Sequence, residues 1–141
     1  MSSLASPDQL PSALVALADE LVGRIWGHFT ARAAELNLSI PEAKALANLD
    51  ADHAMPMRSL AVRLHANPSN VTVIVARLEA RGLLERHVGD DRRVKSVRLT
   101  PTGLALRQKL QARLLADHPA VRGLTHDEQQ TLLALLRRLQ N

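Results

Sequence analysis

The sequence predicts a mainly α-helical fold with a small two- or three-stranded antiparallel sheet. Apolar residues recur at helical spacing through most of the chain, and helix-start patterns precede several of these runs. Near the middle, two short runs with the alternation typical of β-strands flank a charged turn, as in a hairpin. With 141 residues, 46% of them apolar, we expect a single domain over residues 1–141 with a core of its own.

Two helices are expected in the first third of the chain. The segment from Pro11 to about Leu36 should form one long helix, because its apolar residues keep helical spacing and no proline interrupts them. Ser39 is followed three positions later by Glu42, the pattern of a capping box. The box predicts a second helix that runs to about Asp50.

Two short helices joined by a turn are expected next. Residues 54–56 should form a short connection, and residues 57–64 the first of the two helices. Asn67 then supplies a cap and Pro68 stands at the first position of the second helix, which should end at Gly82. Two short helices around a three- or four-residue turn make a helix-turn-helix.

A hairpin and two closing helices complete the expected order. Strands are predicted over residues 83–88 and 94–99, joined by the charged turn 89–93. A helix over about 100–117 starts at a Thr-Pro pair, and a last helix over 125–139 opens on a Thr-x-x-Glu capping box.

The positive charge of the chain lies in its middle third. The net charge is +4, but the segment from Met55 to Gly103 holds nine basic and four acidic residues, an excess of five positive charges. The rest of the chain holds nine basic and ten acidic residues. This distribution is typical of a surface that faces phosphates.

Several functional classes are disfavoured by composition. Without cysteine, the chain has no disulfide, no thiolate nucleophile and no cysteine zinc site. Trp26 and Phe29 are its only aromatic residues, too few for a platform on which bases of single strands or RNA could stack. Its six histidines show no i, i+4 pair, and we find no nucleophile–base set or phosphate loop. We therefore expect neither an enzyme nor a metal or cofactor.

We expect no membrane association and a cytoplasmic location. No apolar run reaches the roughly 18 to 20 residues that a spanning helix needs. The first residues, Met-Ser-Ser-Leu-Ala-Ser-Pro-Asp, have neither the basic opening nor the apolar stretch of a secretory signal.

Three stretches together carry a resemblance to a known family. They are LSIPEAKALANL, LAVRLHANPSNVTVIVARLEARGLLER and DDRRVKSVRLTPTG. At this spacing the chain resembles the MarR family of winged-helix transcriptional regulators over nearly its whole length. The resemblance implies a winged helix-turn-helix in which the hairpin is the wing, with a DNA-binding lobe over about 39–100. It also implies a homodimer held by long N- and C-terminal dimerisation helices over about 10–36 and 101–140.

The function that follows is a DNA-binding transcriptional regulator, a ligand-responsive repressor that binds palindromic duplex DNA as a homodimer. Two half-sites are expected because one recognition helix covers few base pairs. Two alternatives remain open at this stage. One is a winged-helix protein-interaction module that has lost DNA binding, and the other is a protein that binds a small molecule or a metal without a genetic role.

The helix after Pro68 should be the recognition helix. On a helical wheel Val71, Ile74, Val75 and Leu78 form one side and should pack into the core. The opposite side should enter the major groove, which admits one helix. Its expected DNA contacts are Pro68, Ser69, Asn70, Thr72, Val73 and Arg77. Val73 could contact a thymine methyl group, or it could be an incidental surface valine.

The charged turn of the hairpin should also contact DNA. By the resemblance, Arg93 reaches into the minor groove and Asp91 holds it in position. Arg92 and Lys95 are expected on flanking phosphates, and Arg58 is a further expected DNA contact. The alternative is a solvated turn with a surface ion pair of little value.

Both ends of the chain carry more leucine than one thin layer can bury, which predicts the dimer interface. The residues are Leu10, Leu14, Leu110, Leu114, Leu115, Leu124, Leu132, Leu133, Leu135, Leu136 and Leu139. The resemblance also implies a small aromatic or anionic effector, for which Trp26, His28, Phe29 and Arg32 are the expected ligand-binding residues. They could equally be ordinary core and surface residues.

Overall fold

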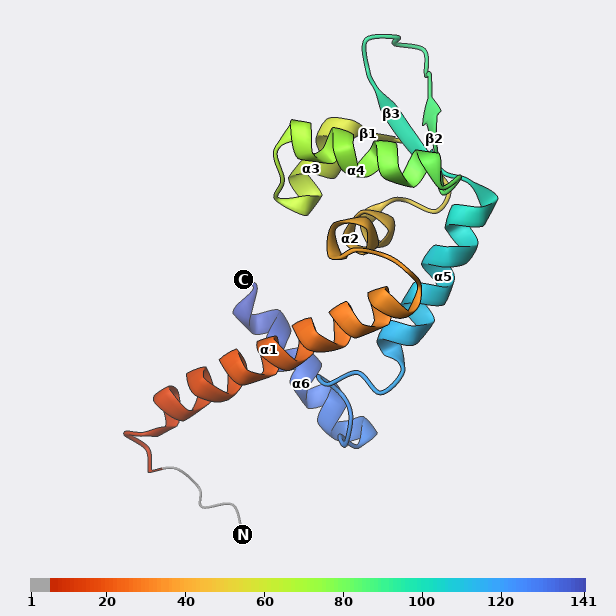
Figure 1. The fold of residues 1–141 in the computed structure, drawn as a ribbon. Helices are drawn as coiled ribbons and strands as arrows, with labels where there is room; N and C mark the ends of the chain where they lie inside the picture. The colour runs from red at the N-terminus through yellow and green to blue at the C-terminus, as the bar shows by residue number, and fades with distance from the viewer. Residues whose placement is uncertain (1–5) are drawn as a thin grey trace. The chain divides into compact units, whose positions relative to one another are not determined.

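The computed structural model of the chain describes residues 6–141 and confirms the predicted fold class (Figure 1). The helices are α1 (Leu10–Glu35), α2 (Ile40–Asn48), α3 (Met57–Leu64), α4 (Pro68–Ala80), α5 (Pro101–Leu115) and α6 (His126–Leu139). The strands are β1 (Met55–Pro56), β2 (Leu84–His87) and β3 (Ser96–Leu99). Most predicted boundaries lie within one or two residues of these.

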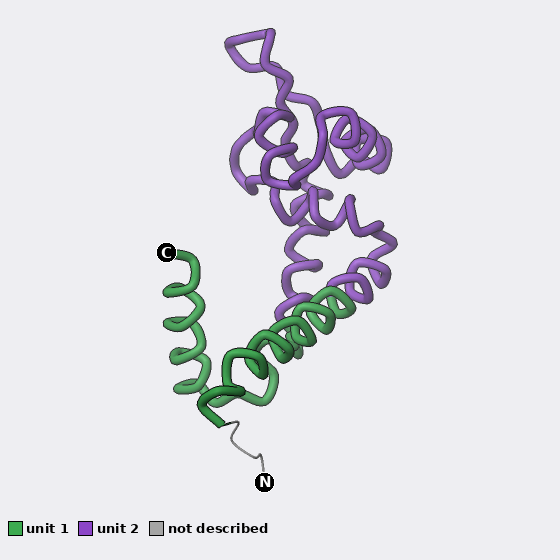
Figure 2. Tube along the Cα trace, turned by 90° about the vertical axis from the view of Figure 1, so that its left-hand side faces the viewer, with its two compact units in different colours: residues 1–28, 116–141 green, residues 29–115 purple. Residues whose placement is uncertain are grey.

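The described residues fall into two compact units (Figure 2). Unit 1 contains most of α1 and all of α6, within residues 1–28 and 116–141. Unit 2, residues 29–115, contains the last turns of α1, the helices α2 to α5 and all three strands. Unit 2 therefore includes the whole predicted DNA-binding lobe.

The sheet has three strands in the order β1-β3-β2, and all pairs are antiparallel. The expected short connection at residues 54–56 is in part a strand, since Met55 pairs with Val97 and Pro56 with Ser96. The backbone N–H of Met57 continues the contact by donating to the carbonyl of Lys95 at 2.8 Å. A proline fits here because β1 is an edge strand, where a missing N–H donor is tolerated.

The helix caps form as predicted. The Ser39 hydroxyl accepts from the Glu42 N–H at 3.3 Å, and the Glu42 carboxylate accepts from the Ser39 N–H at 2.8 Å. Asn67 accepts from the Asn70 N–H at 2.9 Å, with Pro68 in the first turn of α4. Each cap satisfies a backbone donor that the first helical turn leaves without a partner.

One hydrophobic core holds unit 2 together. Its largest fully buried side chains are Leu46, Leu49, Leu60, Leu78, Leu110, Val71, Val75 and Val97. They come from α2 to α5 and β3, so the core fixes these elements against one another. Leu110 was expected at a dimer interface, but its 0% exposure places it in this core.

The helices of unit 1 expose many apolar side chains. On α1 these include Leu10, Leu14 and Val22, and α6 has no buried residue along its whole length. The exposed leucines of α6 are Leu133, Leu135, Leu136 and Leu139. The homodimer remains a prediction that these faces support.

Across residues 6–141 we find no helix with the length and apolar character to cross a membrane. The N-terminal stretch in which no secretory signal was found lies mostly outside the described residues.

Candidate nucleic-acid interface

The helix α4 buries one side and exposes the other, as the helical wheel predicts. Val71, Val75 and Leu78 are at most 1% exposed, and Ile74 is half-buried. Val73 on the opposite side is 51% exposed. The other exposed residues that we expected to face DNA are Pro68, Ser69, Asn70, Thr72 and Arg77. The core thus holds α4 by its apolar side and leaves the polar side accessible.

Local hydrogen bonds fix the first turn of α4. The Ser69 hydroxyl donates to the Asn67 side chain at 2.7 Å, and the Thr72 hydroxyl donates to the Pro68 carbonyl at 2.9 Å. Both hydroxyl protons are therefore in use, which leaves these two oxygens to act as acceptors. The side-chain amide of Asn70 has no hydrogen bond within the described residues. It can offer a donor and an acceptor together, the pattern with which asparagine recognises adenine.

The nine basic residues of the middle third divide into two groups by their contacts. Four have acceptors on the protein: Arg63 the carbonyl of Asn48, Arg81 the carboxylate of Glu42, Arg86 that of Glu79, and Arg98 that of Glu85. The other five have no side-chain hydrogen bond or ion pair within residues 6–141: Arg58, Arg77, Arg92, Arg93 and Lys95. These five are the basic residues that the sequence assigned to DNA.

Asp91 contacts the backbone of Arg93. Its carboxylate accepts from the backbone N–H of Arg93 at 3.0 Å, and no contact with the Arg93 guanidinium is present. The Asp91 carbonyl also accepts from the Val94 N–H at 3.1 Å. Asp91 thus shapes the turn of the wing, the hairpin of β2, β3 and residues 88–95, because an aspartate bonded two residues ahead forms an Asx turn. The Arg93 side chain extends from that turn.

A basic hollow of about 260 Å³ lies at the base of the wing. Its lining residues are Pro56, Met57, Arg58, Arg93, Val94 and Lys95. Three of the five unpartnered cations thus line one concave surface, from the start of α3 and the returning side of the wing. Such a surface can hold an anionic oxygen such as that of a phosphodiester.

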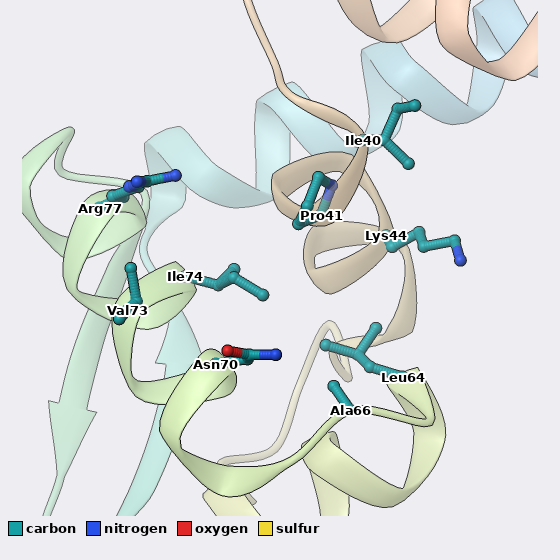
Figure 3. Close-up of a pocket in the computed structure, with 9 residues that line it drawn as sticks. All are labelled: Ile40, Pro41, Lys44, Leu64, Ala66, Asn70, Val73, Ile74 and Arg77. Atoms are coloured by element: carbon teal, nitrogen blue, oxygen red, sulfur yellow. The ribbon is translucent and has the colours of Figure 1, made fainter.

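A second hollow, of about 380 Å³, lies beside α4 (Figure 3). Its lining residues are Ile40, Pro41, Lys44, Leu64, Ala66, Asn70, Val73, Ile74 and Arg77. The first three come from the start of α2, where the sequence predicts a helix cap but no ligand contact. Apolar side chains line most of it, and Lys44 and Arg77 add positive charge.

The four expected effector residues, Trp26, His28, Phe29 and Arg32, all lie on α1. Trp26 and His28 belong to unit 1, whereas Phe29 and Arg32 belong to unit 2. Phe29 packs against the core of unit 2, and Arg32 lies 3.1 Å from Glu35. Neither hollow described above is lined by any of the four.

His28 has a specific neighbour. Its ring meets that of His118 edge to face, with 5.3 Å between centroids. In the described part of the chain no group of three or more His, Asp or Glu side chains could hold a metal ion.

The fold and the exposed α4 define the class: a winged helix-turn-helix protein with a basic face. Residues 38–95 match the family model described as MarR family. This segment, which contains the helix-turn-helix and most of the wing, is similar to the MarR family. No curated protein matches the chain in sequence.

Solved structures of other proteins resemble this fold over nearly the whole chain. A MarR-family transcriptional regulator from Silicibacter pomeroyi is 28% identical, with a TM-score of 0.73 over 96% of this chain and 94% of that chain. The YusO protein from Bacillus subtilis is 25% identical, with a TM-score of 0.74 over 96% and 97%. CouR, a transcriptional repressor solved with a 23-mer DNA duplex, has the same fold at 23% identity, with a TM-score of 0.75 over 99% and 100%.

Proposed function

We propose that the chain is a transcriptional regulator that binds palindromic duplex DNA as a homodimer and acts as a ligand-responsive repressor. The exposed side of α4 enters the major groove, and the wing reaches the minor groove with Arg93. One observation carries the proposal: the five basic residues without a protein acceptor lie on α3, α4 and the wing of one unit.

These cations favour a polyanionic partner. A surface arginine normally gains little from an ion pair. In this region three of the nine basic residues pair with a carboxylate, a fourth bonds to a carbonyl, and five have no such acceptor. Phosphates supply the missing acceptors, and their binding releases counterions, which provides most of the affinity for DNA. The exposed amide of Asn70 and the methyl groups of Val73 supply contacts to base edges.

The two-fold symmetry of a homodimer implies a palindromic operator. The exposed apolar faces of α1 and α6 support a two-fold contact, and a two-fold dimer requires an operator of matching symmetry. Its half-sites should lie about one helical turn, roughly 34–36 Å, apart. CouR, which has this fold, was solved on a DNA duplex, and a mutant of MepR from S. aureus was solved with an oligodeoxyribonucleotide.

Duplex binding over a salt series tests the proposal. We expect the logarithm of the association constant to fall with the logarithm of the salt concentration, with a slope of about −4 to −9, because each phosphate contact contributes about −0.9. A slope near zero, or no binding to duplexes selected from a random pool, would favour the protein-interaction module instead.

Charge-matched variants make that test specific. Arg92→Gln removes an unpartnered cation and should flatten the slope by about 1.8 in a dimer, which loses two contacts. Arg86→Gln removes the same charge from a residue that already pairs with Glu79 at 3.1 Å, and it should change the slope much less. Equal changes for both variants would mean that only overall charge matters.

The hollow beside α4 is the best-supported site for the effector. A small aromatic anion would fit its apolar lining and lie next to Lys44 and Arg77. Because Asn70, Val73 and Arg77 also face the expected DNA, a bound effector would compete with DNA. Small aromatic carboxylates should therefore weaken the DNA complex.

A variant that removes a positive charge from the hollow provides the control. Lys44→Gln should retain DNA binding, since Lys44 lies on α2 and is not an expected DNA contact, and it should respond much less to the carboxylates. If the carboxylates dissociate the DNA complex of this variant as well, the effector site lies elsewhere.

A further inference from the structure

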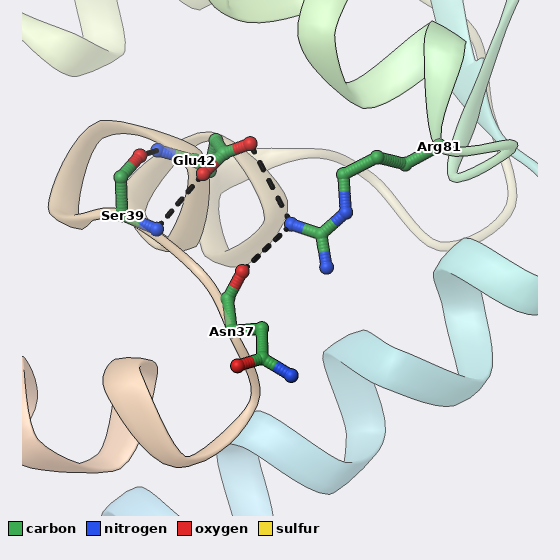
Figure 4. A network of polar contacts seen from close by, with 4 residues as sticks. All are labelled: Asn37, Ser39, Glu42 and Arg81. Carbon is green, nitrogen blue, oxygen red and sulfur yellow. Dashed lines mark hydrogen bonds and ion pairs between the residues drawn. The ribbon is translucent and has the colours of Figure 1, made fainter.

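A polar bridge joins the end of α4 to the corner between α1 and α2 (Figure 4). Arg81, the residue after α4, donates from Nη1 to the carbonyl of Asn37 at 2.9 Å. The same nitrogen lies 3.5 Å from the Glu42 carboxylate. Residues 44 positions apart in the sequence are thus in direct contact.

Each acceptor of the bridge is held in place by its own surroundings. Asn37 has a left-handed backbone, with φ of 56°, just after α1 ends at Glu35. Glu42 accepts from the Ser39 N–H while it pairs with Arg81, and its side chain is only 12% exposed. Burial alone would raise the pKa of Glu42, but hydrogen bonds from Ser39 and the charge of Arg81 hold this pKa below its ordinary value. Glu42 is therefore an anion at neutral pH.

The bridge acts where apolar packing between α2 and α4 is incomplete. The hollow of about 380 Å³ separates Ile40, Pro41 and Lys44 of α2 from Asn70, Ile74 and Arg77 of α4. On the core side, Val71, Val75 and Leu78 hold α4 in place. The bridge adds a polar contact between the C-terminal end of α4 and the α1–α2 corner to this apolar packing.

We propose that Arg81 is a positioning residue for DNA recognition. By joining Glu42 and the Asn37 carbonyl, it sets the angle at which the exposed side of α4 enters the major groove. The proposal rests on the proposed function. It differs from a direct role of Arg81 on phosphate, because the arginine acts through its protein acceptors.

Glu42→Gln separates the two roles. Glutamine at this position keeps the capping box of α2, since either side chain can accept from the cap N–H, but it removes the charge that holds Arg81. A freed Arg81 that contacted phosphate would strengthen binding to every duplex. A positioning role instead predicts weaker discrimination between DNA sequences. We expect the affinity ratio between a duplex selected by the wild-type protein and an unrelated duplex of equal length to fall about fivefold or more.

Glu79→Gln is the matched control. It causes the same change in net charge and releases Arg86 from a carboxylate 3.1 Å away, but it leaves the bridge intact. We expect its discrimination ratio to equal that of the wild type. Urea midpoints of both variants, measured alongside, separate altered geometry from loss of folding.

The double variant completes the test. Arg81→Ala should lower discrimination at least as much as Glu42→Gln does. The two changes together should be no worse than Arg81→Ala alone, since Arg81→Ala removes both contacts of the bridge and Glu42→Gln leaves the bond with the Asn37 carbonyl. Equal ratios for Glu42→Gln and Glu79→Gln, or additive losses in the double variant, would overturn the positioning role. A wild-type protein that does not discriminate between duplexes would overturn the proposed function, and this inference with it.

Discussion

Replacing Gly103 with alanine is expected to destabilise unit 2 by about 3 kcal/mol, the upper end of the usual cost of overpacking. A Cβ atom at this position would lie 1.9 Å from the carbonyl oxygen of Leu83 and 2.8 Å from its carbonyl carbon. Both are backbone atoms, so no side-chain rotation can relieve the clash. Either the start of α5 or the chain before β2 has to move.

Neither segment is free to move. The Leu83 carbonyl accepts from the Thr100 N–H at 3.1 Å, and the Leu83 side chain is buried. The Thr100 hydroxyl donates to the Gly82 carbonyl at 2.6 Å and accepts from the Gly103 N–H at 3.0 Å. The first turn of α5 is therefore bonded directly to the segment that leads from α4 into the wing.

Urea unfolding at fixed protein concentration measures the effect of the Gly103→Ala change. Fixed concentration matters because dimerisation contributes to apparent stability. Gly89→Ala is the control, since a Cβ atom at Gly89 meets no atom within 4 Å. We expect its midpoint to stay near that of the wild type. A loss below about 1 kcal/mol for Gly103→Ala would show that this close approach relaxes easily.

Local signals explain why so much of the fold could be predicted. The caps at Ser39, Asn67 and Thr125 are short patterns whose partners lie three residues away, so the sequence contains both sides of each contact. The two sides of α4 follow from helical geometry alone. These features do not depend on distant parts of the chain.

Features that depend on distant partners could not be predicted. The two residues of β1 show no alternation, and only their pairing with β3 makes them a strand. Leu110 and the exposed leucines of α6 belong to the same leucine-rich ends of the chain, from which the sequence predicts a dimer interface. The core of unit 2 buries Leu110 all the same.

The contacts of the candidate site also depend on residues that are distant in the sequence. The sequence shows nine basic residues in the middle third, but their division into partnered and unpartnered groups depends on Glu42 and other distant acceptors. The resemblance implies that Asp91 holds Arg93 in position, but it does not say that the Asp91 carboxylate does so through the backbone N–H of Arg93.

Arg93→Ala is expected to weaken binding to a selected duplex about 100-fold, since each of two protomers loses a contact worth about 1–3 kcal/mol. Arg93 is exposed at the wing, has no side-chain acceptor among residues 6–141, and lines the basic hollow with Arg58 and Lys95. Its removal breaks no side-chain hydrogen bond or ion pair among residues 6–141. Folding and dimerisation should therefore be unaffected, and sedimentation at equal concentrations checks this.

Arg98→Ala is the matched control for the wing. It removes the same charge from β3 of the same hairpin, but the Arg98 guanidinium already pairs with Glu85. We expect a much smaller loss of affinity for this variant. Equal losses for Arg93→Ala and Arg98→Ala would contradict the assignment of Arg93 to the DNA contact.

Arg93→Lys tests where on the DNA the side chain lies. Lysine keeps the charge, so a contact with a phosphate alone should lose little affinity and keep its salt dependence. A narrow A·T-rich minor groove favours arginine, and lysine loses the planar donor group with which arginine enters the groove. If Arg93 enters the minor groove, the loss for Arg93→Lys should be largest on duplexes with A·T-rich flanks and smaller on G·C-rich ones. The same loss on both kinds of flank would place Arg93 on the phosphate backbone, next to Arg58 and Lys95 at the base of the wing.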